Sequence, residues 1–267
     1  VARWHVNFSR IAMTGIDAPF FEFLSLFFLV RLLRHGRLRD AMWAGLTLGL
    51  GLMFYTAFRL YLVALLIFAI VASLRWWPWL VATRRNQGWP GHLGRIAMLV
   101  LAAWLVIMPV AKFALDNSEA FWYRTRQISI FTKRDQPDLA QALWSSTHQH
   151  LLMFNFQGDK NGRHNLPGEP MLDPAMGIFA ILGLGLALTR TRYPANTFFL
   201  ILLPAALIGG ILSVDFEAPQ SLRSIAVFPA VIYFIGLALA TLGQQLNQSG
   251  YPGAAADAYA RSIQKDP

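Results

Sequence analysis

Long apolar stretches separated by short polar segments run along most of this chain. A helix needs about 20 mainly apolar residues to cross the hydrocarbon core of a bilayer, so stretches near that length are candidate spans. Seven qualify: residues 16–33, 41–58, 60–74, 96–111, 174–189, 198–213 and 224–242. The pattern predicts an all-α fold, a polytopic transmembrane helix bundle of about seven spans.

The second and third candidate spans are separated only by Arg59. A single helix over residues 41–74 would be about 50 Å long at 1.5 Å per residue, too long for a hydrocarbon core of about 30 Å. We therefore predict a tight helical hairpin with Arg59 at its tip.

The composition agrees with a membrane protein. Apolar residues make up 55% of the chain and charged residues 14%, with a mean hydropathy of +0.43, whereas a soluble domain has about a quarter charged residues. The net charge of +9 comes from short cationic clusters between apolar runs rather than from one basic stripe, so no nucleic-acid partner is expected. The absence of cysteine excludes disulfides, thiolate zinc sites and cysteine nucleophiles.

The basic clusters fall on alternate loops, which indicates an orientation. They are Arg31, Arg34, Arg37 and Arg39 after the first span, Arg75, Arg84, Arg85 and Arg95 after the third, and Arg190 and Arg192 after the fifth. The positive-inside rule places these loops in the cytoplasm. Residues 1–15, the tip at Arg59, residues 112–173 and residues 214–223 then face outward, and the tail after the last span is cytoplasmic.

Residues 112–173 form the longest connection between spans and are rich in aromatic residues. A segment of this length and composition is neither a plain connector nor a disordered one, so we expect it to fold against the outer membrane surface. The apolar spacing over residues 139–153 predicts an interfacial helix within it.

The C-terminal residues 244–267 differ in character from the membrane domain, residues 1–243. From Leu242 on, the spacing is similar to that of a tetratricopeptide repeat, with Ser262 where alanine is usual. The matching residues are Leu242, Gly243, Leu246, Gly250, Ala255, Tyr259 and Pro267. Because one repeat cannot bury its apolar face, we expect further repeats. Together with the start at Val1, this predicts a fragment cut at both ends. The tail is also the part of the chain through which a protein partner could bind.

Three arginines stand at the predicted outer ends of spans: Arg10, Arg59 and Arg223. Arginine binds phosphate through charged, often bidentate, hydrogen bonds, so the three together are candidate ligands of a lipid phosphate. The alternative is that each one reaches the lipid headgroups on its own.

The densest polar cluster is the segment Gly158 to Pro174, where glycines and prolines fix an irregular backbone. Asp159, Arg163, His164 and Asn165 within it suit a loop that contacts a substrate or acceptor. The alternative is a solvated turn that leads into the next span, with Asp173 as the N-cap.

No metal site is predicted. Asp159 and Asn161 match the first ligand spacing of a calcium loop, but Arg163 follows and no glutamate stands at the twelfth place. His148 and His150 on a helix would point in nearly opposite directions, which does not suit zinc. The sequence therefore assigns no cofactor, and a divalent cation remains an open alternative without support from it.

Two features lie inside the spans. Gly45 and Gly49 have the spacing of a helix-packing surface. Glu22 is the one acid that we place inside a span, where it either reaches the outer interface or lines a site.

Three segments carry a resemblance to a known family: residues 4–10, residues 49–59 and the loop Gly158 to Pro174. Together they are similar to the polytopic GT-C glycosyltransferases of the dolichyl-phosphate-mannose protein mannosyltransferase and aminoarabinose transferase type, in the bacterial family 39 form. The triplet Phe8-Ser9-Arg10 before a span and the pair Leu222-Arg223 before the last span recur in that family. Its bacterial members can carry C-terminal tetratricopeptide repeats.

The resemblance implies an inverting glycosyltransferase in the bacterial inner membrane. Such an enzyme moves a sugar from a polyprenyl-phosphate donor to an acceptor at the periplasmic face. The family's catalytic acid lies in a first outward loop, which corresponds to sequence upstream of Val1, so no catalytic residue is carried over and this fragment alone is expected to be inactive. Two alternatives are an O-antigen ligase or polymerase-like membrane enzyme, and a membrane transporter.

Overall fold

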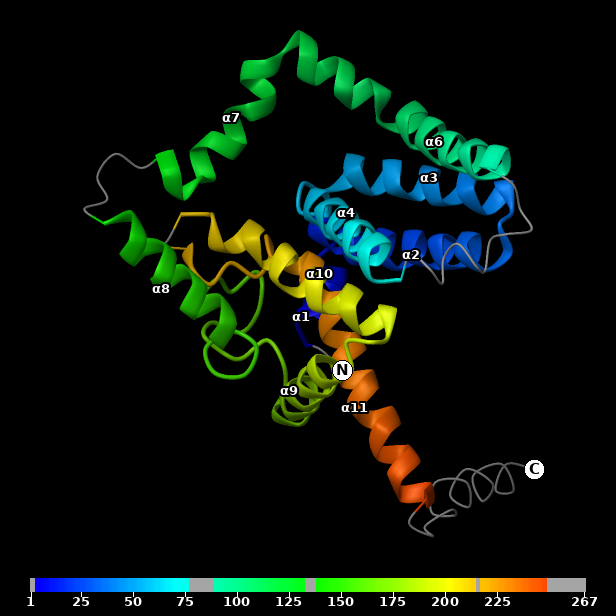
Figure 1. Ribbon diagram of the computed structural model, residues 1–267. Helices are drawn as coiled ribbons and strands as arrows, with labels where there is room; N and C mark the ends of the chain where they lie inside the picture. Colours follow the sequence, from blue (N-terminus) through cyan, green and yellow to red (C-terminus); the bar gives the residue numbers. More distant parts are fainter. Residues whose placement is uncertain (1–2, 77–88, 133–137, 215–216, 249–267) are drawn as a thin grey trace, which may run out of the picture.

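The computed structural model describes residues 3–76, 89–132, 138–214 and 217–248, and these residues are mainly helical (Figure 1). The principal helices are α1 (Arg3–Arg10), α2 (Asp17–His35), α3 (Leu38–Phe54), α4 (Phe58–Arg75), α6 (Trp89–Asp116), α7 (Ser118–Ile128), α8 (Leu139–Leu152), α9 (Pro174–Thr189), α10 (Pro194–Ile211) and α11 (Phe228–Gln248). Short 3-10 turns are η1 (Thr14–Ile16), η2 (Ile130–Thr132) and η4 (Ile225–Val227).

Each predicted span corresponds to a helix, namely α2, α3, α4, α6, α9, α10 and α11. Within the described residues, four segments are long and apolar enough to cross a membrane: Phe58–Arg75, Gly91–Asp116, Pro194–Ile211 and Ile225–Asn247. The others fall short because α2 carries more charged residues and because α3 and α9 are shorter. The fold is therefore that of an all-helical membrane protein, with four candidate spans.

The chain breaks between α3 and α4, as predicted, and no single long helix forms. The turn consists of residues 55–57, so Arg59 lies in the first turn of α4 rather than at the tip. The hairpin is not tight, however, because α3 packs mainly on α2 and α6 whereas α4 packs on α10. Gly45 and Gly49 explain this pairing, since a Cβ on either would collide with a backbone carbonyl of α6.

The helices form two groups. One contains α2, α3 and α6, which lie alongside one another in Figure 1. The other contains α4, α9, α10 and α11, in which the backbone of α9 at Gly183 lies directly against the carbonyl of Phe234 in α11. The contacts within each group are more extensive than those between the groups.

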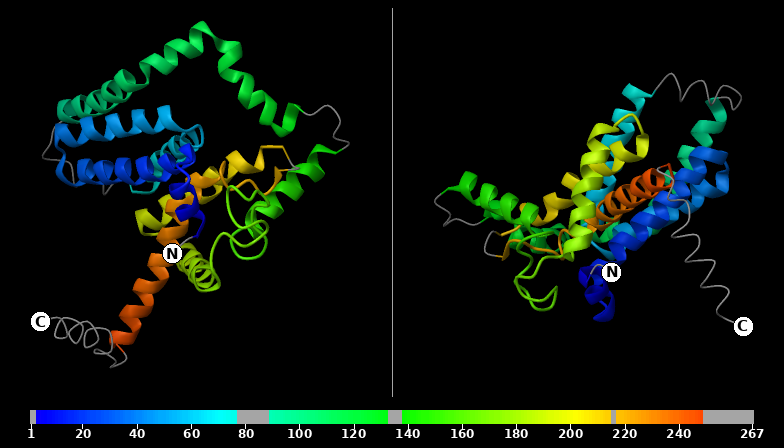
Figure 2. Two further views of the ribbon diagram at one scale, coloured as in Figure 1. Left: turned by 180° about the vertical axis from the view of Figure 1, so that it is seen from behind. Right: turned by 90° about the horizontal axis from the view of Figure 1, so that it is seen from below.

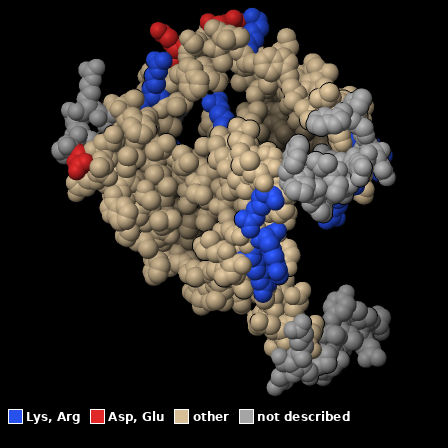
Figure 3. Space-filling view, viewed as in Figure 1, with Lys and Arg blue, Asp and Glu red and all other residues tan. Residues whose placement is uncertain are grey.

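Helix α2 has its polar side inward and its aromatic side outward. Ala18, Glu22 and Ser25 are buried, whereas Phe20, Phe23 and Phe27 are 59%, 41% and 52% exposed. Large apolar residues are also exposed along α6, and residues other than Lys, Arg, Asp and Glu cover most of the face seen in Figure 3. Exposure of this much apolar surface requires a hydrocarbon environment, so the bilayer is the medium of this bundle.

The predicted outer segment 112–173 begins later than expected, because α6 continues to Asp116. It then contains α7 and α8, and α8 confirms the helix predicted over residues 139–153. Helices α6 and α7 together form an arch beside the rest of the molecule (Figure 1), and Figure 3 shows an opening beneath it.

The predicted boundary between residues 243 and 244 lies inside a continuous helix, since α11 runs to Gln248. Most of the predicted tetratricopeptide-like tail, from Gly250 to Pro267, lies outside the described residues.

Candidate functional site

The segments predicted to face outward meet at one end of the bundle. The Tyr55 hydroxyl donates to the Leu222 carbonyl at 3.3 Å, which joins the α3–α4 turn to the segment before α11. The Phe8 and His164 rings meet edge to face at 5.4 Å, and α1 lies beside the loop before α9 in both views of Figure 2. These contacts bring four stretches that are distant in sequence into one polar region.

Contacts at the opposite end join segments that the sequence places in the cytoplasm. Arg75, at the end of α4, donates to the Thr191 hydroxyl between α9 and α10 at 3.5 Å. Arg190 similarly donates to Thr241 of α11. The two sets of predicted loops therefore lie at opposite ends of the bundle.

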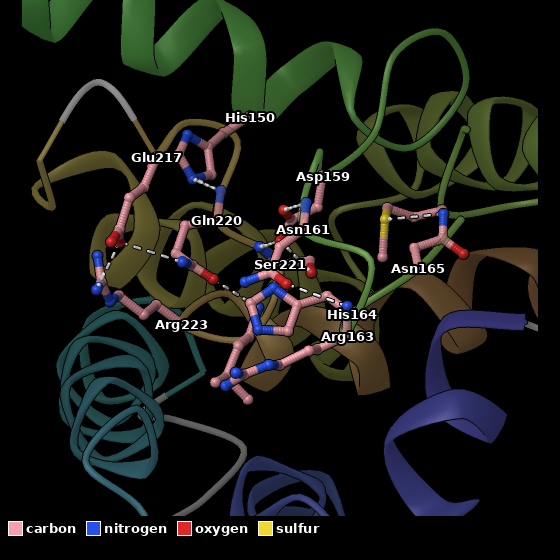
Figure 4. Close-up of polar contacts among 12 residues, drawn as sticks. His150, Asp159, Asn161, Arg163, His164, Asn165, Glu217, Gln220, Ser221 and Arg223 are labelled. Atoms are coloured by element: carbon pink, nitrogen blue, oxygen red, sulfur yellow. Dashed lines mark hydrogen bonds and ion pairs between the residues drawn. The ribbon is translucent and has the colours of Figure 1, made fainter. Parts of the chain in front are cut away.

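Asp159 organises the polar region (Figure 4). Its Oδ2 accepts hydrogen bonds from the Ser221 amide at 2.9 Å, from the Ser221 hydroxyl at 2.7 Å and from His164 Nδ1 at 2.6 Å. Its Oδ1 accepts from the Asn161 amide at 2.8 Å. Asp159 is only 2% exposed, so four hydrogen bonds from protein donors replace those that water would make to this carboxylate.

The hydrogen bonds decide the charge of Asp159. Burial acts to raise the pKa of Asp159, but the bonds from His164, Asn161 and Ser221 favour the ionised form and leave the pKa below its ordinary value. The carboxylate is therefore ionised at neutral pH. It holds residues 158–171 against the segment before α11, a structural role that the sequence analysis did not assign to it.

His164 is oriented by this carboxylate. Because ionised Asp159 can only accept, His164 Nδ1 carries the proton between them. Nε2 has no hydrogen-bond partner among the described residues. With the Nδ1 proton directed at Asp159, Nε2 is the nitrogen through which this ring can exchange a proton or bond a hydroxyl group. The trio is not a hydrolase triad, because the Ser221 hydroxyl donates to the aspartate rather than to the histidine.

The other two predicted loop residues differ from each other. Asn165 is buried, and its Nδ2 donates to the Glu169 carbonyl at 2.8 Å, while its Oδ1 has no partner among the described residues. The Arg163 side chain is exposed and forms no hydrogen bond with the described residues, whereas its backbone amide donates to Asn161 Oδ1. Asp173 caps α9 as expected, accepting from the Met176 amide.

His150 is buried and forms two hydrogen bonds, although the sequence suggested it only as a weak zinc ligand. Its Nε2 accepts from the Gln220 amide at 3.0 Å, so its Nδ1 bears the proton and donates to the Ser146 carbonyl at 2.7 Å. Burial lowers the pKa of His150 and keeps the ring neutral, although the Ser146 carbonyl and Asp159 partly oppose this effect. His148 is exposed, and the described residues contain no cluster of metal ligands.

Two of the three predicted arginines belong to adjoining segments. A Cβ on Gly209 of α10 would lie 2.9 Å from Leu60 and 3.0 Å from the Arg223 carbonyl, so the start of α4 and Arg223 flank the same point of α10. Arg10 is exposed at the end of α1, and no hydrogen bond or ion pair among the described residues links α1 to the segments that carry the other two.

Each of these two arginines has a protein partner. The Arg59 guanidinium lies 5.0 Å from the Phe121 ring centroid and 5.9 Å from that of Trp122, which ties α4 to α7. Arg223 Nη2 forms a 2.7 Å ion pair with Glu217, visible at the edge of Figure 4. Arg223 Nη1 is buried and has no partner within the described part of the chain.

Comparisons with protein-family models, with curated proteins and with solved structures found no match.

Proposed function

We propose that this chain is part of a membrane glycosyltransferase that moves a sugar from a polyprenyl-phosphate donor to an acceptor at the outer face of a bacterial inner membrane. The proposal joins the GT-C resemblance of the sequence to the polar region at one end of the bundle. The tetratricopeptide-like tail would add a protein partner on the cytoplasmic side.

The observation that carries the proposal is the unpartnered Nη1 of Arg223. A buried guanidinium donor without an acceptor is costly unless a ligand supplies one, and a phosphate oxygen is a fitting acceptor. Arg59 lies in the first turn of the adjoining helix α4, and its guanidinium faces the Phe121 ring of α7, the second helix of the arch. The two arginines would hold the phosphate at headgroup level, with the isoprenoid chain passing into the bilayer through the opening.

His164 supports the acceptor half of the proposal. With Asp159 fixing the Nδ1 proton, Nε2 is available to accept a hydrogen bond from an acceptor hydroxyl or amine. Arg163, exposed beside it, would contact the acceptor's polar groups. Asp159 and Asn165 would act behind them by holding the loop in shape.

Binding of undecaprenyl phosphate to the purified chain, measured by native mass spectrometry, tests the donor half. Arg223→Gln and Arg59→Gln should each weaken binding roughly 10- to 150-fold, because each removes a charged hydrogen-bond donor worth about 1.5–3 kcal/mol. Glu217→Gln should strengthen binding, since it removes the carboxylate that competes for Arg223. The matched control is Arg39→Gln, an exposed arginine on the predicted cytoplasmic side. Equal binding by all four variants would refute the phosphate site.

A transporter is the second candidate because of one observation. Glu22 is 1% exposed within α2, and neither of its carboxylate oxygens has a partner among the described residues. A buried acid in a span is characteristic of proton or ion pathways. Proton uptake by proteoliposomes that depends on Glu22 and is lost in Glu22→Gln would favour this alternative.

An O-antigen ligase or polymerase-like enzyme would instead require undecaprenyl diphosphate, the competitor to include in the binding experiment.

A further inference from the structure

A groove along the outward side of α2 has no role in the proposed transferase site. Its volume is about 650 Å³, which is in the range of small-molecule sites. His5 of α1 and Phe228 at the start of α11 form one wall. Helix α2 contributes Asp17 and an apolar stripe of Pro19, Phe20, Phe23, Leu24 and Phe27.

The stripe has the length of one bilayer leaflet. Its members recur at helical spacing, so they share one face of α2. From Asp17 to Phe27 the helix rises about 15 Å, half of a hydrocarbon core of about 30 Å. The polar end of the groove lies at the end of the bundle that carries α1 and the predicted outward loops. The groove therefore begins at headgroup level and runs towards the middle of the membrane.

The polar end of the groove carries a single negative charge. Asp17 forms no ion pair or side-chain hydrogen bond with the described residues. The His5 ring is stacked on Phe228 with centroids 4.4 Å apart, and burial lowers the pKa of His5, so this imidazole is neutral at pH 7. No cation lines the groove among the described residues.

We propose that this groove binds an outer-leaflet phospholipid whose headgroup carries a primary ammonium, that is, a lipid of the ethanolamine class. The ammonium donates to the Asp17 carboxylate, and one acyl chain lies along the aromatic stripe. The carboxylate excludes the donor's phosphate from this position, because two anions would face each other at the low-dielectric edge of the membrane. The groove is therefore separate from the arginine site in both charge and location.

Native mass spectrometry with phosphatidylethanolamine, phosphatidylglycerol and phosphatidylcholine of identical acyl chains tests the proposal. The chain should retain phosphatidylethanolamine roughly tenfold more than phosphatidylglycerol, the effect of one charged hydrogen bond. The chain should also retain phosphatidylethanolamine more than phosphatidylcholine, whose quaternary ammonium has no N–H to donate. Asp17→Asn should reduce retention of phosphatidylethanolamine to the level of phosphatidylglycerol, and Asp17→Glu should keep most of the preference.

The matched control is Glu119→Gln. Glu119 is also an acid in the first turn of a helix, α7, and is exposed, so its replacement removes a similar charge and a similar helix-dipole interaction away from the groove. Phe23→Ala should lower retention of phosphatidylethanolamine without changing the melting temperature in lipid-free detergent, because Phe23 faces outward. Equal retention of the three lipids, or a preference that survives Asp17→Asn, would overturn the proposal. The assay contains no polyprenyl phosphate, so its outcome is independent of the transferase proposal.

Discussion

The buried polar residues at the outer end determine how the irregular segments are held. Asp159 and His150 both bond to the short stretch before α11, Asp159 through Ser221 and His150 through the Gln220 amide. Residues 218–224, to which both side chains bond, form no regular helix or strand. The two hydrogen bonds hold this stretch where no backbone ladder does, and Arg223 belongs to it.

His150 predicts how stability depends on pH. The unfolded chain binds a proton at this ring more readily than the folded chain, because burial lowers the folded-state pKa. The stabilising contribution is therefore complete above the ordinary histidine pKa of about 6.5 and is lost as the pH falls below it. The melting temperature of the protein in detergent should therefore decrease when the pH is lowered from 7.5 to 5.5.

His150→Gln should reduce this pH dependence, whereas His148→Gln, at an exposed histidine in the same helix, should leave it unchanged. His5 has a pKa shift of the same sign, so His5→Gln should remove a further part of the slope. A slope that is identical in His150→Gln and the parent chain would contradict the assignment.

The sequence identified half of this region. Asp159 and His164 stood out because they lie five residues apart in one polar loop. Their connection to Ser221 did not, because the partner is 62 residues away, and the partner of His150 is 70 residues away. Such pairings depend on how the helices pack, which local composition does not encode.

At the scale of elements, glycines determine which helices are neighbours. Long apolar stretches located all seven predicted helices because they mark residues that avoid water. The apolar pattern could not predict that α3 packs against α6 rather than against α4, since lipid-facing and helix-facing surfaces are equally apolar. Small residues carry that information, as Gly45 and Gly49 show. The helical α7 was also missed, because its mixture of aromatic and charged residues has no clear apolar face.

Gly183→Ala should destabilise the bundle by about 1–3 kcal/mol, the usual cost of overpacking. An added Cβ would collide with the Phe234 carbonyl, and a backbone atom cannot move aside without separating α9 from α11. Gly185→Ala is the control on the same helix, since nothing lies within 4 Å of its Cβ, and it should be neutral or stabilising by up to about 1 kcal/mol. Unfolding in a titration with sodium dodecyl sulfate measures both, and equal effects would refute the α9–α11 contact.

At the scale of the whole molecule, the loops sort into two ends, which predicts two sides of a membrane. The chain has no cysteine, so a single introduced cysteine shows on which side of the membrane its residue lies, without labelling of native cysteines. Lys160→Cys and Glu169→Cys should react with a membrane-impermeant maleimide in intact cells. Arg39→Cys and Arg192→Cys should react only after the membrane is permeabilised. All four residues are exposed. Labelling of all four in intact cells would refute the predicted topology.

The division into two helix groups has a mechanical consequence. The group of α2, α3 and α6 is closely packed within itself, and so is the group of α4, α9, α10 and α11. The chain first passes from one group to the other at residues 55–57, with Arg59 immediately beyond, and it crosses again between α4 and α6 and between α6 and α9. A swing of one group as a rigid body about this turn would widen or narrow the opening beneath the arch without unwinding any helix, and Arg59, held between Phe121 and the pivot, would move with it.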